Sequence, residues 1–190
     1  MNYSPEQIAE FVEGDLISST NQFISHVSTD SRSVQNSSNS IFFALKTDKR
    51  NGHDFITELI EKGVRTFVIA EDNDFNGNDL TLIKVKNTLE ALQNFAACHR
   101  KLFDIPIIGI TGSYGKTIVK EWLYQLLNPD YTICRSPKSF NSQLGVPLSV
   151  LLLEDQHTLG IFEAGISTVG EMEKVTNYNK TKYWGINKNG

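Results

Sequence analysis

A short glycine-rich run in the middle of the chain contains the residue types that a phosphate-binding loop needs. The run Gly112-Ser113-Tyr114-Gly115-Lys116-Thr117 lies between an apolar stretch at 107–110 and a segment with helical spacing. A chain of phosphates is densely anionic, so backbone N–H groups at the start of a helix bind it well. Glycine lets the backbone approach such a ligand, lysine can reach the terminal phosphates, and a threonine hydroxyl can bind Mg²⁺. The run therefore predicts a site for ATP with Mg²⁺.

The run departs from the strict phosphate-loop pattern G-x-x-x-x-G-K-[ST], which begins with a glycine. Ile110 occupies that first position here, and the nearby glycines are Gly109 and Gly112. The alternative interpretation is an ordinary glycine-rich turn. The apolar strand before the run, the helix after it and the Gly-Lys-Thr ending together favour the phosphate loop.

Glu163 is a candidate for the same site. It follows the apolar stretch 159–162, which predicts a buried strand, and it precedes Ala164-Gly165, where the backbone can turn. Ligands bind beyond the carboxyl ends of strands in open α/β sheets, and Mg²⁺ takes oxygen ligands. Glu163 could therefore bind Mg²⁺, although spacing alone leaves a solvated loop residue as an equal alternative.

The elements that must position these residues alternate between strands and helices. Strands are predicted over 24–28, 41–45, 65–70, 81–85, 107–110, 131–134, 159–162 and 183–186, and helices over 5–14, 52–63, 87–103, 116–127, 141–153 and 171–178. This alternation is typical of an α/β fold. We expect a small N-terminal α/β domain over 1–104, then the first part of a parallel-sheet ATP-binding domain over 105–190.

Composition narrows the class of protein. The net charge is −4, with 39% hydrophobic and 21% charged residues, which is ordinary for a globular protein and argues against a nucleic-acid partner. No apolar run approaches the ~20 residues that span a bilayer, and the N-terminus lacks the pattern of a signal peptide. Cys98 and Cys134 show no metal-binding or disulfide spacing. We expect a cytoplasmic protein without membrane insertion.

Several motifs together resemble the Mur ligase superfamily of peptidoglycan synthesis. The loop Thr111-Gly112-Ser113-x-Gly115-Lys116-Thr117 is similar to that family's own phosphate loop. Three further segments resemble an N-terminal domain that holds a UDP-linked sugar: Thr29-Asp30-Ser31-Arg32, Phe42-Phe43-Ala44-Leu45-Lys46 and Gly52-His53-Asp54-Phe55. The resemblance covers essentially the whole chain.

Two more motifs favour one branch of the superfamily, the ligases that join D-alanyl-D-alanine to UDP-N-acetylmuramoyl-tripeptide. These are the segment 139–148 and the pattern Glu163-x-Gly165-x-x-x-x-Gly170-Glu171-Met172. The resemblance implies that ATP phosphorylates the terminal carboxylate of the tripeptide, and that the amine of the dipeptide then attacks the acyl phosphate. Positioning and charge neutralisation supply most of the catalysis in phosphoryl transfer.

The resemblance also implies roles for single residues. Lys116, Glu163 and Asn141 would be catalytic, with Lys116 neutralising phosphate charge and Asn141 contacting the substrate or ordering the metal site. ATP would be bound by the loop residues Thr111, Gly112, Ser113, Tyr114, Gly115, Lys116 and Thr117, and Mg²⁺ by Thr117 and Glu163. Substrate would be bound by Ser31, Arg32, Lys46, His53 and Asn141. The alternative for Arg32 is a surface ion pair, and the alternative for His53 is a helix cap.

Three features depart from the family pattern. Tyr114 and Ile118 stand where the family usually has Asn and Thr, but the backbone donors remain, so we expect ATP binding to tolerate both. The end of the chain, 187–190, departs before an expected segment with a histidine, and a downstream lysine and a C-terminal domain do not follow. We expect an incomplete ligase that binds its ligands at best. The alternatives are the related ligase that adds the third peptide residue, folylpolyglutamate synthase, or a non-catalytic module that binds ATP or a UDP-sugar.

Overall fold

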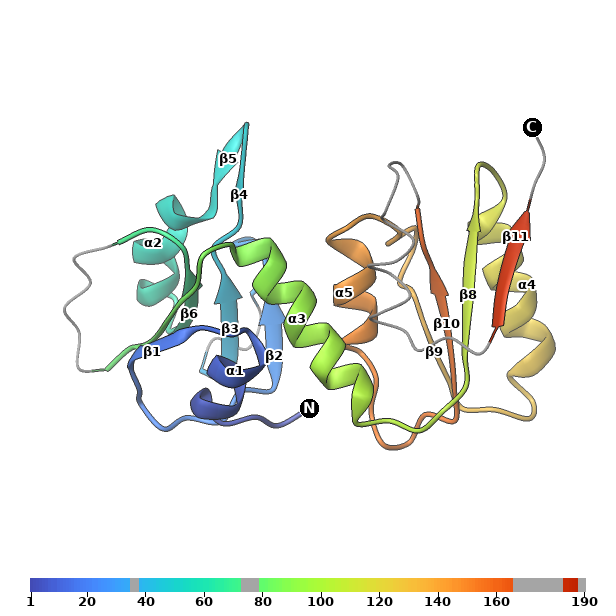
Figure 1. Ribbon diagram of the computed structural model, residues 1–190, viewed down its shortest axis with the longest axis horizontal. Coiled ribbons are helices and arrows are strands. Elements are labelled where there is room, and N and C mark those ends of the chain that lie inside the picture. The colour runs from blue at the N-terminus through green and yellow to red at the C-terminus, as the bar shows by residue number, and fades with distance from the viewer. Residues whose placement is uncertain (35–37, 73–78, 166–182, 188–190) are drawn as a thin grey trace. The chain divides into compact units, whose positions relative to one another are not determined.

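The computed structural model describes residues 1–34, 38–72, 79–165 and 183–187, the last of these through the backbone alone. The chain forms two compact units, Met1–Phe95 and Ala96–Gly190, which are coloured blue to green and green to red in Figure 1. The division falls inside helix α3 (Thr88–Lys101). The functional boundary near residue 104 stays a prediction.

The first unit is built around a five-stranded sheet. Its strand order is β1 (Asp15–Ser18), β7 (Thr81–Lys84), β6 (Thr66–Ile69), β3 (Ser40–Phe43) and β2 (His26–Ser28). All neighbouring strands are parallel except β1, which runs antiparallel to β7. Every residue of β3 and β6 is buried, as expected for central strands of a parallel sheet.

Short elements complete this unit. Helix α1 (Pro5–Phe11) begins with a capping box, in which the Ser4 hydroxyl accepts from the Gln7 N–H and the Gln7 side chain accepts from the Ser4 N–H. A small hairpin, β4 (Lys46–Thr47) and β5 (Arg50–Asn51), precedes the 3-10 turn η1 (Gly52–Phe55) and helix α2 (Ile56–Glu61). Phe42 of β3 and Phe67 of β6 meet edge to face in the core beneath α2.

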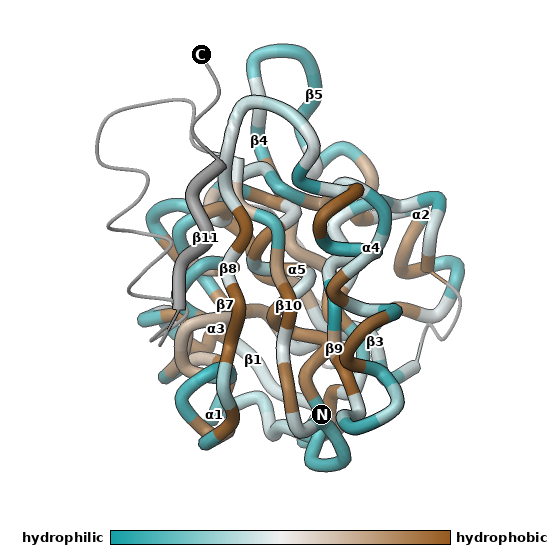
Figure 2. The backbone as a smooth tube through the Cα atoms, turned by 90° about the vertical axis from the view of Figure 1, so that its right-hand side faces the viewer, coloured by the Kyte–Doolittle hydropathy of each residue, from teal (hydrophilic) through white to brown (hydrophobic). Residues whose placement is uncertain are grey.

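The second unit is a four-stranded sheet in which every strand is parallel to its neighbours. Its order is β11 (Tyr183–Asn187), β8 (Ile107–Gly112), β10 (Leu159–Glu163) and β9 (Ile133–Arg135). The tube in Figure 2 is brown along much of β8 and β10, the apolar inner strands. Helix α4 (Lys116–Leu127) follows β8, and α5 (Gly145–Val150) precedes β10.

The structure confirms the predicted α/β class with parallel sheets and corrects several elements. The helix expected over 141–153 is only Gly145–Val150. A Cβ atom on Gly145 would lie 2.8 Å from the Phe140 carbonyl carbon, so the chain folds back closely on itself before this helix begins. Strand β1 and the hairpin were not predicted, because their short polar sequences carry little apolar alternation. The helix expected over 171–178, with Gly170, Glu171 and Met172, lies outside the described residues.

Within the ranges that the structure describes, no helix combines the length and the apolar character that crossing a bilayer requires.

Candidate functional site

The glycine-rich run forms the connection from β8 to α4. Gly112 has φ 144° and Gly115 has φ 77°, values that other residues adopt only with strain. Helix α4 begins directly after Gly115, and no side chain caps its first turn. Ser113, Tyr114 and Gly115 are exposed. The first N–H groups of a twelve-residue helix are therefore available to an anion, as the sequence predicted.

The two polar residues at the start of α4 already engage groups of this loop and sheet. The Lys116 ammonium donates to the carbonyl oxygen of Gly112 at 2.6 Å, so the side chain lies over the loop. The Thr117 hydroxyl donates to Oε2 of Glu163 at 3.1 Å. The structure thus brings together the predicted phosphate loop and the predicted carboxylate, which are 46 residues apart in sequence.

Glu163 reaches this place because β10 lies next to β8 in the parallel sheet. Its Cα pairs with that of Ile110, at the carboxyl edge where β8 enters the loop. The residue is fully buried, and its backbone N–H donates to the Ser136 hydroxyl at 3.0 Å. The solvated-loop alternative for Glu163 is therefore wrong. A buried carboxylate needs partners, because desolvation of a charge is costly.

Lys120, which sequence reasoning missed, supplies one partner. Its side chain is fully buried, and its ammonium nitrogen lies 2.9 Å from Oε1 of Glu163. This oxygen makes no hydrogen bond. The contact is therefore an ion pair in which the two groups are close but not oriented as a hydrogen bond requires. The signal was available: Lys120 is one helical turn beyond Thr117, on the side of α4 that the sequence pattern turns toward the sheet.

Asn141 also lies close to the end of β10. Its carbonyl oxygen accepts from the Gly165 N–H at 2.6 Å. A Cβ atom on Gly165 would lie 2.8 Å from that carbonyl oxygen, so glycine permits this close approach. Asn141 is therefore held beside the turn that follows Glu163. Its role in binding the substrate or ordering the metal site stays a prediction.

The donors at the carboxyl edge suit Mg²⁺. Glu163 Oε2 and the Thr117 hydroxyl oxygen lie 3.1 Å apart, whereas Glu163 Oε1 faces the Lys120 ammonium. Among the described residues no group of three or more His, Cys, Asp and Glu side chains is placed to hold a metal ion. Mg²⁺ commonly takes only one or two protein oxygens and completes its shell with phosphate oxygens and waters. The pair Thr117 and Glu163 is sufficient for a site of that kind.

Of the residues predicted to contact a UDP-sugar, Ser31 and Arg32 lie together in the first unit, Lys46 and His53 lie in the same unit, and Asn141 lies in the second unit. Ser31 is buried, and its hydroxyl accepts from the Arg50 guanidinium at 3.4 Å. The Lys62 ammonium donates to the Ser31 carbonyl oxygen at 3.4 Å. Arg50 lies over the Phe55 ring, with its guanidinium carbon 4.3 Å from the ring centroid. Arg50 and Lys62 were not predicted, because nothing in the local sequence places them beside Ser31.

Arg32 is the most exposed member of this group. Its guanidinium makes an ion pair with Asp30 at 2.6 Å, and 77% of its side chain is exposed. The hydrogen bonds from Arg32 hold the pKa of the Asp30 carboxyl well below its usual range. The surface ion pair considered from the sequence is present. A contact between Arg32 and a diphosphate stays a prediction, and it would compete with Asp30.

Lys46 and His53 belong to a neighbouring network. Lys46 pairs with Glu71 at 2.5 Å, and Glu71 also accepts from the Asn51 side-chain amide. His53 Nε2 accepts from the Ala70 N–H at 3.0 Å, so Nδ1 carries the hydrogen and donates to Asn51 Oδ1 at 2.7 Å. Burial lowers the pKa of His53. Because both ring nitrogens are used within the protein, a substrate contact by His53 would require one of these bonds to break.

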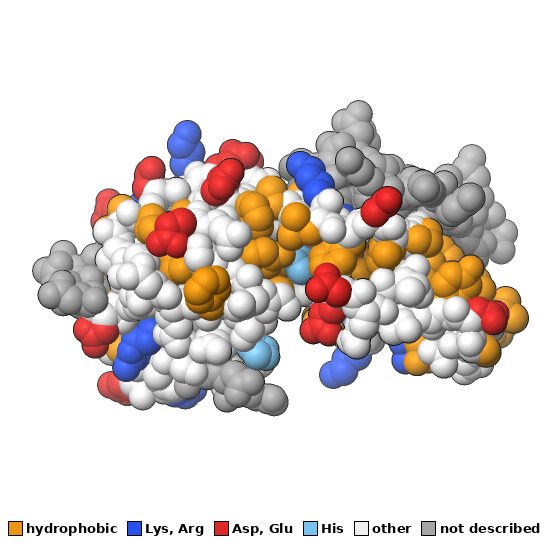
Figure 3. Space-filling model, turned by 90° about the horizontal axis from the view of Figure 1, so that it is seen from below, with side chains coloured by type: hydrophobic (Ala, Val, Ile, Leu, Met, Phe, Trp, Pro, Cys, Tyr) orange, Lys and Arg blue, Asp and Glu red, His pale blue; other side chains and the backbone are white. Residues whose placement is uncertain are grey.

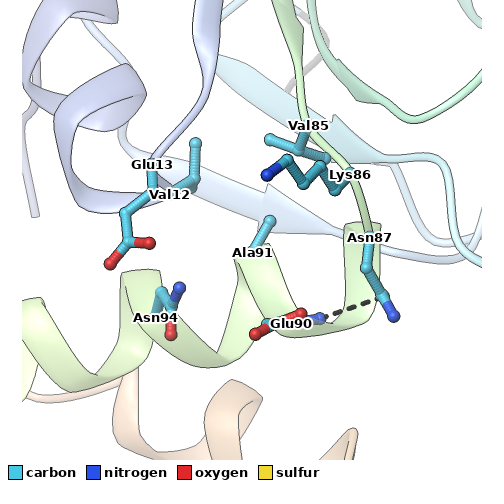
Figure 4. A pocket seen from close by; sticks show the side chains of 8 residues that line it. All are labelled: Val12, Glu13, Val85, Lys86, Asn87, Glu90, Ala91 and Asn94. Carbon is cyan, nitrogen blue, oxygen red and sulfur yellow. Dashed lines mark hydrogen bonds between the residues drawn. The ribbon is translucent and has the colours of Figure 1, made fainter.

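A small pocket of about 220 Å³ lies elsewhere in the first unit (Figure 4). It is lined by Val12, Glu13, Val85, Lys86, Asn87, Glu90, Ala91 and Asn94. Asn87 is turned to the first turn of α3, where its side chain accepts from the Glu90 N–H at 3.2 Å. The pocket contains none of the residues predicted to bind substrate or nucleotide, so it does not change the candidate sites.

Comparison with known proteins agrees with both halves of this arrangement. The profile of the Mur ligase family, catalytic domain, matches residues 23–100, and that of the Mur ligase middle domain matches residues 110–183. The chain belongs to the Mur ligase family. The phosphate loop, α4 and Glu163 lie in the match to the middle domain, and the Ser31 group lies in the other match.

Individual Mur ligases resemble this chain over most of its length. The UDP-N-acetylmuramoyl-tripeptide–D-alanyl-D-alanine ligase of Borreliella burgdorferi is 34% identical over 166 residues, which is 83% of this chain and 36% of that protein. A crystal structure of MurF from Acinetobacter baumannii matches 98% of this chain and 41% of its own, with a TM-score of 0.90 and 25% identity. MurF from Thermotoga maritima in complex with ADP matches 80% of this chain and 35% of its own, with a TM-score of 0.70 and 27% identity. The chain thus spans less than half the length of these relatives.

Proposed function

We propose that this chain carries the nucleotide-binding and UDP-substrate-binding parts of an ATP-dependent ligase that joins D-alanyl-D-alanine to UDP-N-acetylmuramoyl-tripeptide in peptidoglycan synthesis. The observation that carries the proposal is the hydrogen bond between Thr117 and the buried Glu163, which places a carboxylate beside an uncapped phosphate loop. The relatives named for this reaction support the choice of substrates.

In the proposed reaction a carboxylate oxygen of the tripeptide attacks the γ-phosphorus of ATP, and ADP leaves. The amine nitrogen of D-alanyl-D-alanine then attacks the carbonyl carbon of the acyl phosphate, phosphate leaves, and the amine loses a proton. The N–H groups of 112–117 bind and orient the phosphates, and Lys116 turns from Gly112 to offset their charge. Asn141 helps to place the substrate beside this edge.

Thr117 and Glu163 are the residues that would hold Mg²⁺, which supplies charge neutralisation at the phosphate oxygens when bound. Ser31 and Arg32 would contact the UDP part of the substrate, with Lys46 and His53 at its edge. We place the functional boundary at 104/105 and the protein in the cytoplasm. The proposal includes no nucleic-acid partner and no membrane insertion.

Calorimetric titration of the folded chain with UDP-N-acetylmuramoyl-tripeptide, and separately with ATP and Mg²⁺, tests the proposal. We expect both ligands to bind, and Arg32→Ala to weaken binding of the UDP-substrate by about 10- to 150-fold while leaving ATP binding unchanged, because a charge-assisted hydrogen bond contributes roughly 1.5–3 kcal/mol. A folded chain that binds neither ligand would contradict the proposal.

Phosphate release in the presence of all three substrates then separates turnover from binding alone. Binding of both ligands without phosphate release would leave the chain as a binding module of the same site. Tighter binding of the UDP-dipeptide than of the UDP-tripeptide would point instead to the ligase that adds the third residue.

A further inference from the structure

The fully buried residue of helix α4 is a lysine. Lys120 has no exposed surface, whereas Ile118, Trp122 and Leu126 on the same helix are 57–71% exposed. Helix α4 lies at the right-hand end of the molecule in Figure 1. The same end of the space-filling view in Figure 3 shows exposed hydrophobic side chains. Helices normally turn apolar side chains toward a sheet and charged ones toward water. Val119, Leu123 and Leu127 of α4 follow this rule and pack against the apolar core of the sheet, so the buried Lys120 is the exception, which indicates that it has a task at the sheet edge.

The Lys120 ammonium is surrounded by oxygen atoms from three segments. It donates to the carbonyl oxygen of Ser136 at 2.8 Å and to that of Lys138. It lies 2.9 Å from Glu163 Oε1 and 3.4 Å from Glu121 Oε1. Lysine offers three N–H donors and no acceptor, so a cage of oxygens satisfies it. The ammonium occupies this cage much as a bound cation would.

The same contacts hold the segment that follows β9, which lies beside Glu163. Lys138 has φ 49°, a conformation that costs a non-glycine residue free energy unless its surroundings hold it. Its carbonyl oxygen is held by Lys120. Ser136 in turn accepts from the Glu163 N–H. Lys120 therefore ties α4 both to the segment after β9 and to the end of β10.

We propose that Lys120 is a positioning residue of the nucleotide site, whose ammonium holds Oε1 of Glu163 so that Oε2 stays beside Thr117. Stability alone does not account for a charged pair here, because apolar residues of similar volume often stabilise a protein as well or better. A need to orient the Glu163 carboxylate toward the metal that accompanies the nucleotide accounts for the buried ion pair between Lys120 and Glu163.

This inference rests on the proposed function, and the Mg²⁺ dependence of nucleotide binding tests it. A fluorescent ATP analogue is titrated with the folded chain at increasing Mg²⁺ and again in EDTA. We expect Lys120→Met to raise the Mg²⁺ concentration for half-saturation by about 10- to 100-fold, the usual effect of losing a residue that orients a metal ligand. Binding in EDTA, which uses the loop N–H groups, should change little.

Two further variants keep the test decisive. Lys120→Arg retains the charge, but its planar guanidinium cannot place that charge at the same point among the oxygens, so the folded variant should also raise the Mg²⁺ requirement. Lys101→Met removes an exposed ammonium from the same unit, away from this cage, and should match the wild type.

The outcomes separate this inference from the proposed function. If the wild-type chain fails to bind the analogue at any Mg²⁺ concentration, both are overturned. The other outcome is that the wild type binds, but one of the folded Lys120 variants needs the same Mg²⁺ concentration as the wild type, or a lower one. That result overturns only the positioning role. A merely structural lysine would lower stability in the variants without changing their Mg²⁺ dependence.

Discussion

Arg32 and Arg50 show how two similar residues receive different environments. Arg32 follows Ser31 in sequence, but its guanidinium points to Asp30 and is largely exposed. Arg50 comes from the hairpin, stacks on Phe55 and donates to the Ser31 hydroxyl. A guanidinium that is already held in place loses less conformational entropy when it binds a diphosphate. Arg50 is therefore the better placed of the two.

We predict that Arg50→Ala weakens binding of UDP-N-acetylmuramoyl-tripeptide at least as much as Arg32→Ala. Loss of one charge-assisted hydrogen bond corresponds to roughly a 10- to 150-fold change in affinity. Calorimetry with the folded variants provides the measurement. Lys49→Ala, which removes an exposed charge from the same hairpin, is the matched control. An Arg50→Ala chain that binds like the control would remove Arg50 from the site.

At the scale of elements, helix α3 is anchored at its end by a buried histidine. The His99 Nε2–H donates to the carbonyl oxygen of Leu153 at 3.1 Å, and the His99 ring meets Phe103 edge to face. Burial lowers the pKa of His99 to about 4. The folded state thus favours the neutral ring, and in the unfolded chain a histidine keeps a pKa near 6.5.

This shift gives the second unit a specific acid sensitivity. Between pH 6.5 and 4 the unfolded state binds more protons than the folded state, so stability is retained above this window and is lost as the pH falls through it. The full difference is on the order of 3 kcal/mol. The exchange rates of the β8 and β10 amides are first corrected for the pH dependence of exchange in an unstructured chain. The corrected rates should then rise as the pH is lowered from 6.5 to 4.

His99→Gln tests the cause of this sensitivity. The variant should be less stable than the wild type near pH 7, and the difference should shrink as the pH falls toward 4. His26→Gln, at an exposed site, should follow the wild type throughout. A stability difference that stays constant across the window would show that His99 does not titrate as the structure indicates.

At the scale of the whole molecule, the chain consists of two compact units. The residues proposed to bind the UDP-substrate lie in Met1–Phe95 except Asn141, and those proposed to bind the nucleotide lie in Ala96–Gly190. Cys134 is a natural reporter for the second unit, because it lies in β9 and burial raises the pKa of its thiol to about 12. A thiol with so little thiolate reacts only when the unit opens.

We predict that ATP with Mg²⁺ slows the labelling of Cys134, measured by mass spectrometry in a Cys98→Ser background. A ligand at 100 times its Kd stabilises the bound state by about 2.7 kcal/mol, which corresponds to roughly a hundredfold slower labelling through unit opening. UDP-N-acetylmuramoyl-tripeptide, for which Asn141 is the proposed contact in this unit, should slow the labelling much less than ATP with Mg²⁺. Equal protection by both ligands would contradict the assignment of each ligand to its own unit.

Much of the fold followed from local sequence patterns. Ser4, Pro5 and Gln7 predicted α1, since a capping box acts over only a few residues. The bounds of α4 were also predicted, because the loop before it and the helical spacing within it are both local. The helix around Pro147 was predicted too long, because the close return of the chain at Gly145 depends on Phe140 packing against it. Neither helical spacing nor a capping pattern in the sequence predicts the contact between Phe140 and Gly145.

The sequence alone determined which residues we propose for phosphate binding, because glycine, lysine and threonine at that spacing all belong to one loop and the start of its helix. Only the tertiary structure decided what surrounds that loop. The spacing within α4 puts Lys120 on the side that faces the sheet, but only the register of β10 against β8 brings Glu163 beside it. His53 reads as a substrate ligand or cap until Ala70 and Asn51 occupy its two nitrogens. Burial and partners from distant strands set the role of a charged or polar side chain, and neither is encoded in its immediate neighbours.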